Sequence, residues 1–97
     1  MNYSFEWDPR KAFGNFQKHE ISFARATEVF SDPYALSIFD ETHSTDEDRW
    51  ITIGNTKNDI LIVVIHTFKE IQSDQISIRI ISARKATPKE SKQYQDI

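Results

Sequence analysis

Two arginines stand in or beside a run of isoleucines near the C-terminal end of the chain. In IRIISARKAT, residues 78–87, Arg79 interrupts an alternating strand pattern, and Arg84 and Lys85 follow where that strand should end. Alternation puts Arg79 on the face opposite the isoleucines. An unpaired buried guanidinium is very costly, so Arg79 needs a carboxylate partner, such as Glu6 or another acid, or an open wet cleft. This permanent charge suits a phosphate, because the planar guanidinium pairs with its oxygens.

The direction of Arg84 depends on where the alternation breaks. In a straight strand its side chain points opposite to that of Arg79, because the separation between them is odd. The pattern breaks at Ile81-Ser82. A bulge there, or the end of the strand near Ala83, would turn both arginines toward one place.

The net charge of −3 conceals an uneven distribution. Residues 1–48 carry ten acids and four bases, whereas residues 49–97 carry five acids and eight bases. A local basic patch attracts an anionic partner even in an acidic protein, because screening limits each charge to about 8 to 10 Å. We expect Lys85 and Lys89 to guide such a partner, and the alternative is a solvated terminal helix.

His19 is the candidate for proton transfer. It follows Lys18 at the end of a predicted helix, where the dipole favours the protonated ring, and a histidine that titrates near ~6.5 serves as general acid or base. The alternative is a charge that only complements the helix end. His66 closes a central strand, where a hydrogen-bonded structural role is expected, and His43 is expected to be exposed.

These residue types match metal-free cleavage of RNA. The ribose 2′-hydroxyl is then the nucleophile, and the reaction needs a base, an acid and cations around the phosphorane, for which Lys18, Arg79 and Arg84 are candidates. Lys11 and Trp7 are candidates for RNA binding, Trp7 by stacking a base, although its parity favours the core. The sequence has no phosphate-cradling glycine loop, no G-x-S-x-G elbow and no H-E-x-x-H helix, so we expect no metal and no cofactor.

The loop DETHSTDED, residues 40–48, holds five acids in nine residues. Dense carboxylates bind calcium or magnesium, but this loop lacks the glycine and the ligand spacing of an EF-hand. We expect a solvated connection that stays outside partner interfaces, with a metal site as the alternative.

The length suits a single domain, residues 1–97, with one core. The chain has no cysteine and no apolar opening of signal-peptide length, which fits a reducing cytoplasm. The longest apolar run, at 60–65, is far shorter than the roughly 20 residues that span a bilayer, so we expect no membrane contact.

The hydrophobic periodicity predicts an α+β fold in the order β-α-α-β-β-β-β-α, with a mostly antiparallel sheet. Three helices follow the start signals Asp8-Pro9, Ser22 and Thr87-Pro88, and the second ends at Ser31-Asp32-Pro33. Residues 69–74 are short enough for a hairpin connection. The predicted strands cover residues 3–7, 35–39, 49–54, 60–68 and 75–83.

Three segments resemble the BrnT family of bacterial type II toxins: FEWDPRKAFGNFQKHEISFARATEVFSDP at 5–33, DEDRWITIGNT at 46–56 and IRIISARKATPKESKQY at 78–94. They span most of the chain in the family's order, and the combination of F-E-W-D-x-x-K, N-x-x-K-H and R-I-I-S-A-R is specific. The resemblance implies a fold similar to RelE-type ribonuclease toxins, RNA cleavage that arrests growth, and neutralisation by a BrnA antitoxin with a ribbon-helix-helix domain. It also implies that the complex represses its own operon, so that operator DNA is bound only through the antitoxin complex.

The sequence departs from the family at Glu20, where glycine commonly follows K-H. Glycine ends a helix in a left-handed turn at little cost, so glutamate implies a different helix exit or strain. Its charge favours a protonated His19 but repels RNA.

The family pattern maps onto Glu6, Trp7, Asp8, Lys11, Asn15, Lys18, His19, Arg49, Gly54, His66, Arg79, Ser82, Ala83 and Arg84.

The alternative to a ribonuclease is a catalytically inactive binding module, whose basic groove only sequesters the antitoxin or holds nucleic acid. Direct DNA binding by the chain itself is less favoured, because no predicted helix carries a cluster of side chains suited to the major groove.

Overall fold

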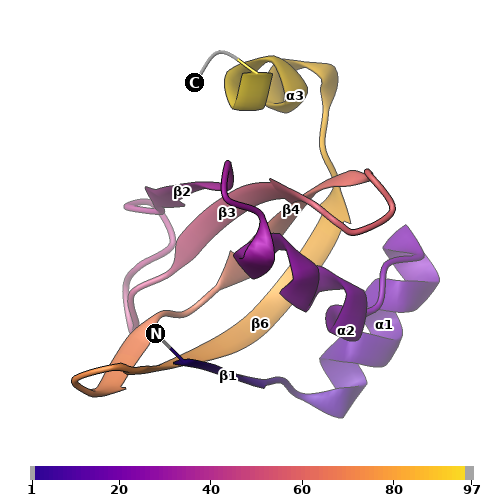
Figure 1. Cartoon of the computed structure of the whole chain (residues 1–97). Coiled ribbons are helices and arrows are strands. Elements are labelled where there is room, and N and C mark those ends of the chain that lie inside the picture. Colours follow the sequence, from indigo (N-terminus) through magenta and orange to yellow (C-terminus); the bar gives the residue numbers. More distant parts are fainter. Residues whose placement is uncertain (1, 96–97) are drawn as a thin grey trace.

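The computed structural model describes residues 2–95 and has the predicted α+β fold (Figure 1). Its elements are β1 (Asn2–Glu6), α1 (Pro9–His19), α2 (Phe23–Ala26), the 3₁₀ helix η1 (Thr27–Ser31), β2 (Leu36–Phe39), β3 (Trp50–Asn55), β4 (Leu61–His66), β5 (Lys69–Gln72), β6 (Gln75–Lys85) and α3 (Pro88–Gln95). None of the helices in this range is long and apolar enough to cross a membrane.

The strands form one sheet in the order β1-β6-β4-β3-β2, and β5 pairs with the first part of β6. β1 runs parallel to β6, whereas the other pairs are antiparallel, so the prediction of a mostly antiparallel sheet is confirmed. The prediction that 69–74 only connects two strands is wrong, because β5 lies within it. The predicted strand at 60–68 ends instead at His66, where the chain leaves the second half of β6 to pair with the first half.

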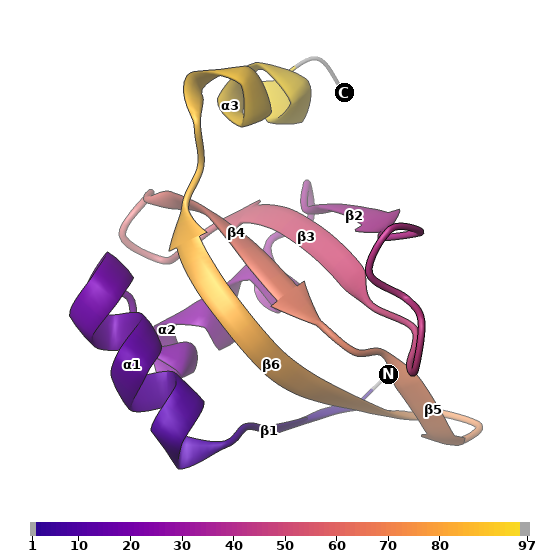
Figure 2. The ribbon, with the colours of Figure 1, turned by 180° about the vertical axis from the view of Figure 1, so that it is seen from behind.

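The core lies between one face of the sheet and the helices α1, α2 and η1, which cover that face (Figures 1 and 2). The second helix is shorter than predicted, because the α-helix passes into η1 at Thr27, whose hydroxyl donates to the Ala24 carbonyl (2.7 Å). The buried residues of this core are Ile21, Phe23, Ala26, Val29, Ile62, Val64, Ile76, Ile78, Ile80 and Ala83.

Local side-chain signals begin the three α-helices where the sequence predicts. Asp8, Ser22 and Thr87 each accept a hydrogen bond from a backbone N–H two or three residues later, at 2.8, 3.0 and 3.2 Å. Glu90 also accepts the N–H of Thr87 (2.9 Å), which completes a capping box at the start of α3. These contacts satisfy donors that the first helical turn leaves without a partner.

α1 ends at a strained residue. Glu20 adopts the left-handed conformation (φ 59°, ψ 28°), and its N–H donates to the Phe16 carbonyl (2.8 Å). The chain therefore leaves α1 through the turn that glycine usually makes, and the glutamate bears the steric cost. The sequence allowed either a different helix exit or strain at Glu20, and the structure shows strain.

β6 contains a bulge at the predicted place. Its register with β4 shifts by one residue and leaves Ile81 as an extra residue. Because of this bulge, Ala83 returns to the core face, where it is fully buried, and Arg84 lies on the same face as Arg79, away from α1, α2 and η1. The strand continues to Lys85, so the alternative that it ends near Ala83 is wrong.

α1 runs beside the edge of β6 that β1 leaves open (Figure 2). β1 pairs with β6 only as far as Arg79. Beyond that point the amide nitrogen of Asn15 donates to the Ala83 carbonyl (2.9 Å), and its oxygen accepts the Ala83 N–H (3.1 Å). The same nitrogen donates to the Ile21 carbonyl (3.1 Å), so one side chain joins the helix, the strand and the turn that follows the helix.

Candidate active site

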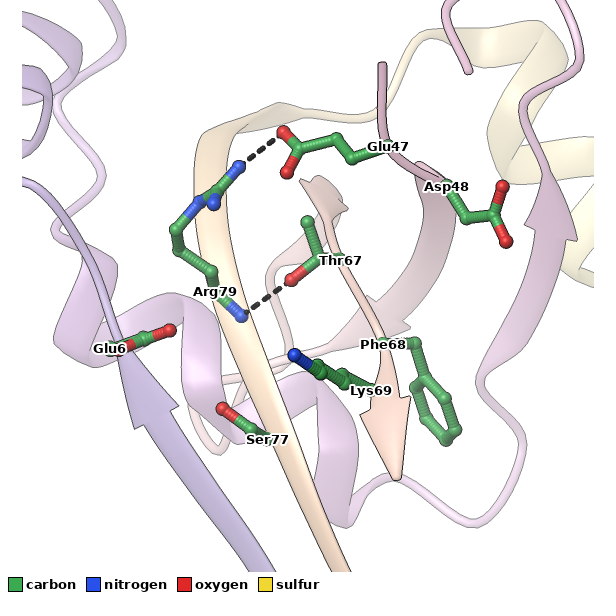
Figure 3. A pocket seen from close by; sticks show the side chains of 8 residues that line it. All are labelled: Glu6, Glu47, Asp48, Thr67, Phe68, Lys69, Ser77 and Arg79. Carbon is green, nitrogen blue, oxygen red and sulfur yellow. Dashed lines mark hydrogen bonds and ion pairs between the residues drawn. The ribbon is translucent and has the colours of Figure 1, made fainter. Parts of the chain in front are cut away.

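A pocket of about 390 Å³ surrounds the Arg79 side chain on the face of β6 that points away from the core (Figure 3). It is built where β1, β5 and β6 meet the segment that joins β4 to β5 and the loop that precedes β3. We call it the Arg79 pocket. Its lining residues are Glu6, Glu47, Asp48, Thr67, Phe68, Lys69, Ser77 and Arg79.

Arg79 has both a carboxylate partner and access to solvent. Its guanidinium donates to the Glu47 carboxylate, toward which it points in Figure 3. The two side chains remain 40% and 36% exposed. Glu6 stands opposite Arg79 in the register with β1 and lines the same pocket, yet the ion pair forms with Glu47. Arg79 therefore pairs with an acid other than Glu6, and its side chain also has the access to solvent that the sequence allowed.

The backbone of Arg79 is held as firmly as its side chain. Its N–H donates to the Thr67 hydroxyl (3.1 Å), and the N–H of Thr67 donates to the Arg79 carbonyl (3.0 Å). These bonds connect β6 to the chain just after β4. The guanidinium thus projects from a fixed point of the sheet, as recognition of an anion requires.

The Arg79 pocket combines two cations, Arg79 and Lys69, with three acids, Glu6, Glu47 and Asp48. Guanidinium and ammonium groups bind phosphate oxygens, whereas a carboxylate accepts a proton from a hydroxyl. The loop at 40–48 is largely exposed, as expected of a solvated connection, but Glu47 near its end also pairs with Arg79. Groups for anion binding and for proton transfer therefore lie in one pocket.

Arg84 shares a face with Arg79 but does not line the Arg79 pocket. Its guanidinium makes two hydrogen bonds, 2.7 and 2.8 Å long, to the carboxylate of Glu90 in α3. The hydrogen bond from Arg84 lowers the pKa of Glu90 to about 2, and the same bond raises the pKa of Arg84. Arg84 is thus engaged in fixing the last helix.

α3 has a second attachment point near its C-terminal end. The Tyr94 hydroxyl donates to the Asp32 carboxylate (2.7 Å) and accepts from the Asn55 amide (3.3 Å). Burial and the Asp32 carboxylate raise the pKa of Tyr94 to about 12. Figure 1 shows α3 beyond the end of β6, apart from the other helices, so these polar contacts at its two ends hold it against the sheet.

Lys18 and His19 lie at the C-terminal end of α1, and Lys11 lies in its first turns. Lys11 and Lys18 are exposed and His19 is half-buried. None of them lines the Arg79 pocket, and within residues 2–95 no hydrogen bond or ion pair joins them to the arginines of β6. The predicted proton-transfer residue His19 and its neighbour Lys18 therefore lie outside the pocket that contains Arg79.

The other predicted RNA-binding residues also lie outside the Arg79 pocket. Lys85 ends β6 and lines a groove of about 300 Å³ beside the end of α1, and Lys89 is exposed at the start of α3. Trp7 is half-buried and packs edge-to-face on Phe23, with ring centroids 6.1 Å apart. Trp7 therefore packs against the core, as its parity predicted.

His66 has the structural role that the sequence predicted. It is buried, its Nδ1–H donates to the Thr67 carbonyl (2.8 Å), and its Nε2 lies 2.6 Å from the Thr52 hydroxyl. Burial lowers the pKa of His66. The ring is therefore neutral, and its bare Nε2 accepts a hydrogen bond from Thr52.

Sequence reasoning missed Glu47, Thr67 and Lys69. In the sequence Glu47 is one of five acids in its loop, and Lys69 begins a segment that reads as a connection between strands. Strand parity identifies the direction of a side chain only within one element. The one available signal was Arg79 itself, whose charge required some acid as its partner.

Comparisons of this chain with known proteins match it to a protein family and to a solved structure. The sequence model of a family described as "Ribonuclease toxin, BrnT, of type II toxin-antitoxin system" matches residues 7–90. Among solved structures, the chain is similar to the crystal structure of the Brucella abortus ribonuclease toxin BrnT, with 30% identity and a TM-score of 0.56. That match covers 89% of this chain and 99% of the Brucella chain. No curated protein sequence gives a significant match.

Proposed function

Because the chain belongs to the BrnT family of ribonuclease toxins of type II toxin–antitoxin systems, we propose that it cleaves RNA in the Arg79 pocket. The observation that supports this location is the half-exposed Arg79 guanidinium, which lies beside a carboxylate in a cavity of about 390 Å³. A phosphodiester that enters the pocket takes the place of Glu47 on the guanidinium. Glu47 is then free and adjacent to the ribose.

The proposed reaction needs no group from outside the pocket. The Glu47 carboxylate accepts the proton of the ribose 2′-hydroxyl, and that oxygen attacks the phosphorus atom. Arg79 stabilises the charge of the phosphorane, and the Lys69 ammonium gives a proton to the departing 5′ oxygen. The products are a 2′,3′-cyclic phosphate and a free 5′-hydroxyl, and exchange with water restores Glu47 and Lys69.

The other charged and titratable residues predicted from the sequence lie outside the Arg79 pocket, and we propose supporting roles for them. Lys18, Lys11, Lys85 and Lys89 attract and guide RNA by charge. If the Glu47 and Lys69 variants still cleave RNA, His19 is the alternative for proton transfer and Arg84 is the alternative for phosphate binding. Arg84 is available to RNA only where Glu90 releases it. Single alanine variants of these residues measure each contribution.

A type II toxin has an antitoxin partner, and we propose that the antitoxin here is a BrnA-type protein with a ribbon-helix-helix domain. It covers the Arg79 pocket and so excludes RNA. Operator DNA is bound through the antitoxin, and the complex represses its own operon in the cytoplasm. Co-purification of the chain with the product of the neighbouring reading frame tests this pairing, and loss of the complex in an Arg79→Glu variant tests the location.

RNA cleavage by purified protein, in the presence of a chelator, tests the catalytic site. Arg79→Ala should lower kcat by about 100- to 1,000-fold, the usual effect of losing one oxyanion donor. The matched control is Arg25→Ala, because Arg25 is also a partly exposed arginine (41%) in an ion pair, here with Glu28. Equal rates for the Arg79 and Arg25 variants would remove Arg79 from the mechanism.

Glu47→Gln separates two roles of the carboxylate. If Glu47 is the base, its loss should slow cleavage by about 100- to 10,000-fold without weakening RNA binding. If Glu47 only neutralises Arg79, the variant should bind RNA more tightly and cleave it at least as fast. The second result would contradict the proposed base.

One observation favours the alternative of an inactive binding module. Both arginines of β6 that the sequence singled out are paired with acids, Arg79 with Glu47 and Arg84 with Glu90. RNA that stays intact with purified protein, while the antitoxin or RNA still binds, would support that alternative.

A further inference from the structure

A second pocket, of about 290 Å³, is lined mainly by aromatic rings. It lies on the opposite face of the sheet from Arg79, because Tyr3 and His66 point to the same side as the core residues Ile76 and Val64. Phe68 lines both pockets. In Figure 3 its ring points away from Arg79. We call this second site the aromatic pocket. Its lining residues are Tyr3, Ser37, Trp50, His66 and Phe68.

The rings of the aromatic pocket lie at the margin of the core. Tyr3 packs on Phe5 and Phe30, and Trp50 packs edge-to-face on Phe39. The Trp50 and Phe68 centroids lie 6.3 Å apart with planes at 52°, which leaves their faces unstacked on one another. Tyr3 and Phe68 remain 41% and 43% exposed. None of these three rings belongs to the buried core cluster. Exposed aromatic rings gathered around a hollow are typical of binding sites.

The polar side of the aromatic pocket presents a hydrogen-bond acceptor. The Thr52 hydroxyl donates to the bare Nε2 of His66, so its oxygen accepts the hydroxyl proton of Ser37, 2.8 Å away. Ser37 thus donates its hydroxyl proton to Thr52, so this proton is not available to a ligand. The Ser37 oxygen keeps free lone pairs at the pocket wall, which suit an N–H donor.

We propose that the aromatic pocket binds an unpaired nucleobase next to the phosphate that is cleaved. The base stacks on Phe68 and Trp50, and one of its N–H groups donates to Ser37. This inference rests on the proposed function, because the RNA backbone must lie in the Arg79 pocket for its neighbouring base to reach beyond Phe68. Stacking on aromatic side chains is the usual way in which proteins hold single-stranded RNA.

An apolar side chain of the antitoxin is the competing occupant. RNA is favoured because the two pockets share Phe68 and because the exposed Ser37 oxygen can accept from an N–H group, which an aliphatic side chain lacks. In the kinetic experiment below, weaker inhibition by the antitoxin without a change in RNA cleavage would indicate this competing occupant.

Kinetics with Phe68 variants form the first test. Phe68→Ala should lower kcat/KM for RNA by roughly 5- to 150-fold, mainly through KM, and should change the base preference at the cleavage site. Phe68→Tyr keeps the ring and should restore both. The control is Ile71→Ala, because Ile71 is 56% exposed in the adjoining β5 and lines neither pocket. Unchanged kinetics in Phe68→Ala, or weaker antitoxin inhibition alone, would overturn the proposal.

Fluorescence titration forms the second test and does not require cleavage. In a Trp7→Phe variant, Trp50 is the remaining tryptophan. At least one nucleoside 5′-monophosphate should quench it in a saturable way, whereas ribose 5-phosphate should not. If the unchanged protein cleaves no RNA, the proposed function fails and the titration alone decides whether a base binds. No response to any of the four nucleotides would overturn the proposal.

Discussion

Replacing Glu90 with glutamine removes the carboxylate that holds Arg84 and the start of α3. The pKa of Glu90 is about 2, against an ordinary value of 4.5, and this difference corresponds to about 3 kcal/mol at neutral pH. Arg84 is 38% exposed, so water and salt screen the pair. We therefore expect Glu90→Gln to lower the free energy of unfolding by about 1 to 2 kcal/mol, or the Tm by about 4 to 16 °C.

The pH dependence of this effect has a definite sign. Because the folded pKa of Glu90 lies below its unfolded value, the contribution is complete above about pH 4.5 and is lost as the pH falls toward 2. The stability difference between the unchanged protein and Glu90→Gln should shrink over that interval. Thermal unfolding followed by circular dichroism at several pH values measures it.

Glu41→Gln is a suitable control, because Glu41 is exposed and makes no hydrogen bond or ion pair within residues 2–95. A double-mutant cycle with Arg84→Gln isolates the interaction between the two side chains. A Glu90→Gln protein as stable as the control at pH 7, or a difference that does not change between pH 5 and 2, would refute the reasoning. The same variant frees Arg84, so a rise in RNA cleavage would show that Arg84 contributes to catalysis.

Three further predictions concern stability. Glu20→Gly should raise the free energy of unfolding by about 0.5 to 1 kcal/mol, because glycine adopts the left-handed turn without a steric cost; a lower Tm would contradict this. Asn15→Ala should lower the free energy of unfolding in urea by about 2 kcal/mol, because the N–H and carbonyl of Ala83 lose their partner. An unchanged urea midpoint would argue that Asn15 does not stabilise the fold through Ala83. Burial lowers the pKa of His66, so stability should fall as the pH drops below about 6.5. In His66→Gln, the free energy of unfolding should fall less steeply as the pH drops below about 6.5. An equal pH dependence in the variant and the unchanged protein would exclude His66 as the cause.

Sequence patterns predicted the features that depend on neighbouring residues. The caps Asp8, Ser22 and Thr87 were identified because a helix start is encoded within about four residues. The bulge of β6 was anticipated from a break in alternation at Ile81-Ser82. Local rules could not predict β5, because its pairing depends on where the first part of β6 lies.

The composition of the Arg79 pocket was beyond the reach of such patterns. The ion pair between Arg79 and Glu47 joins residues 32 positions apart and depends on the path of a loop. Helical periodicity placed Lys18 and His19 on an element without specifying which face of the sheet that element covers. The location of a charge along the chain was thus predictable, whereas its partner required the tertiary structure.

The contact between Asn15 and Ala83 also bears on self-association. A strand whose neighbour stops short presents free N–H and carbonyl groups on which another molecule can add a strand, which is a common origin of aggregation. In β6 a single amide occupies those groups just past the end of β1. Because α1 also lies along this part of β6, the helix and the Asn15 amide together leave no room there for a strand from a second copy of the chain.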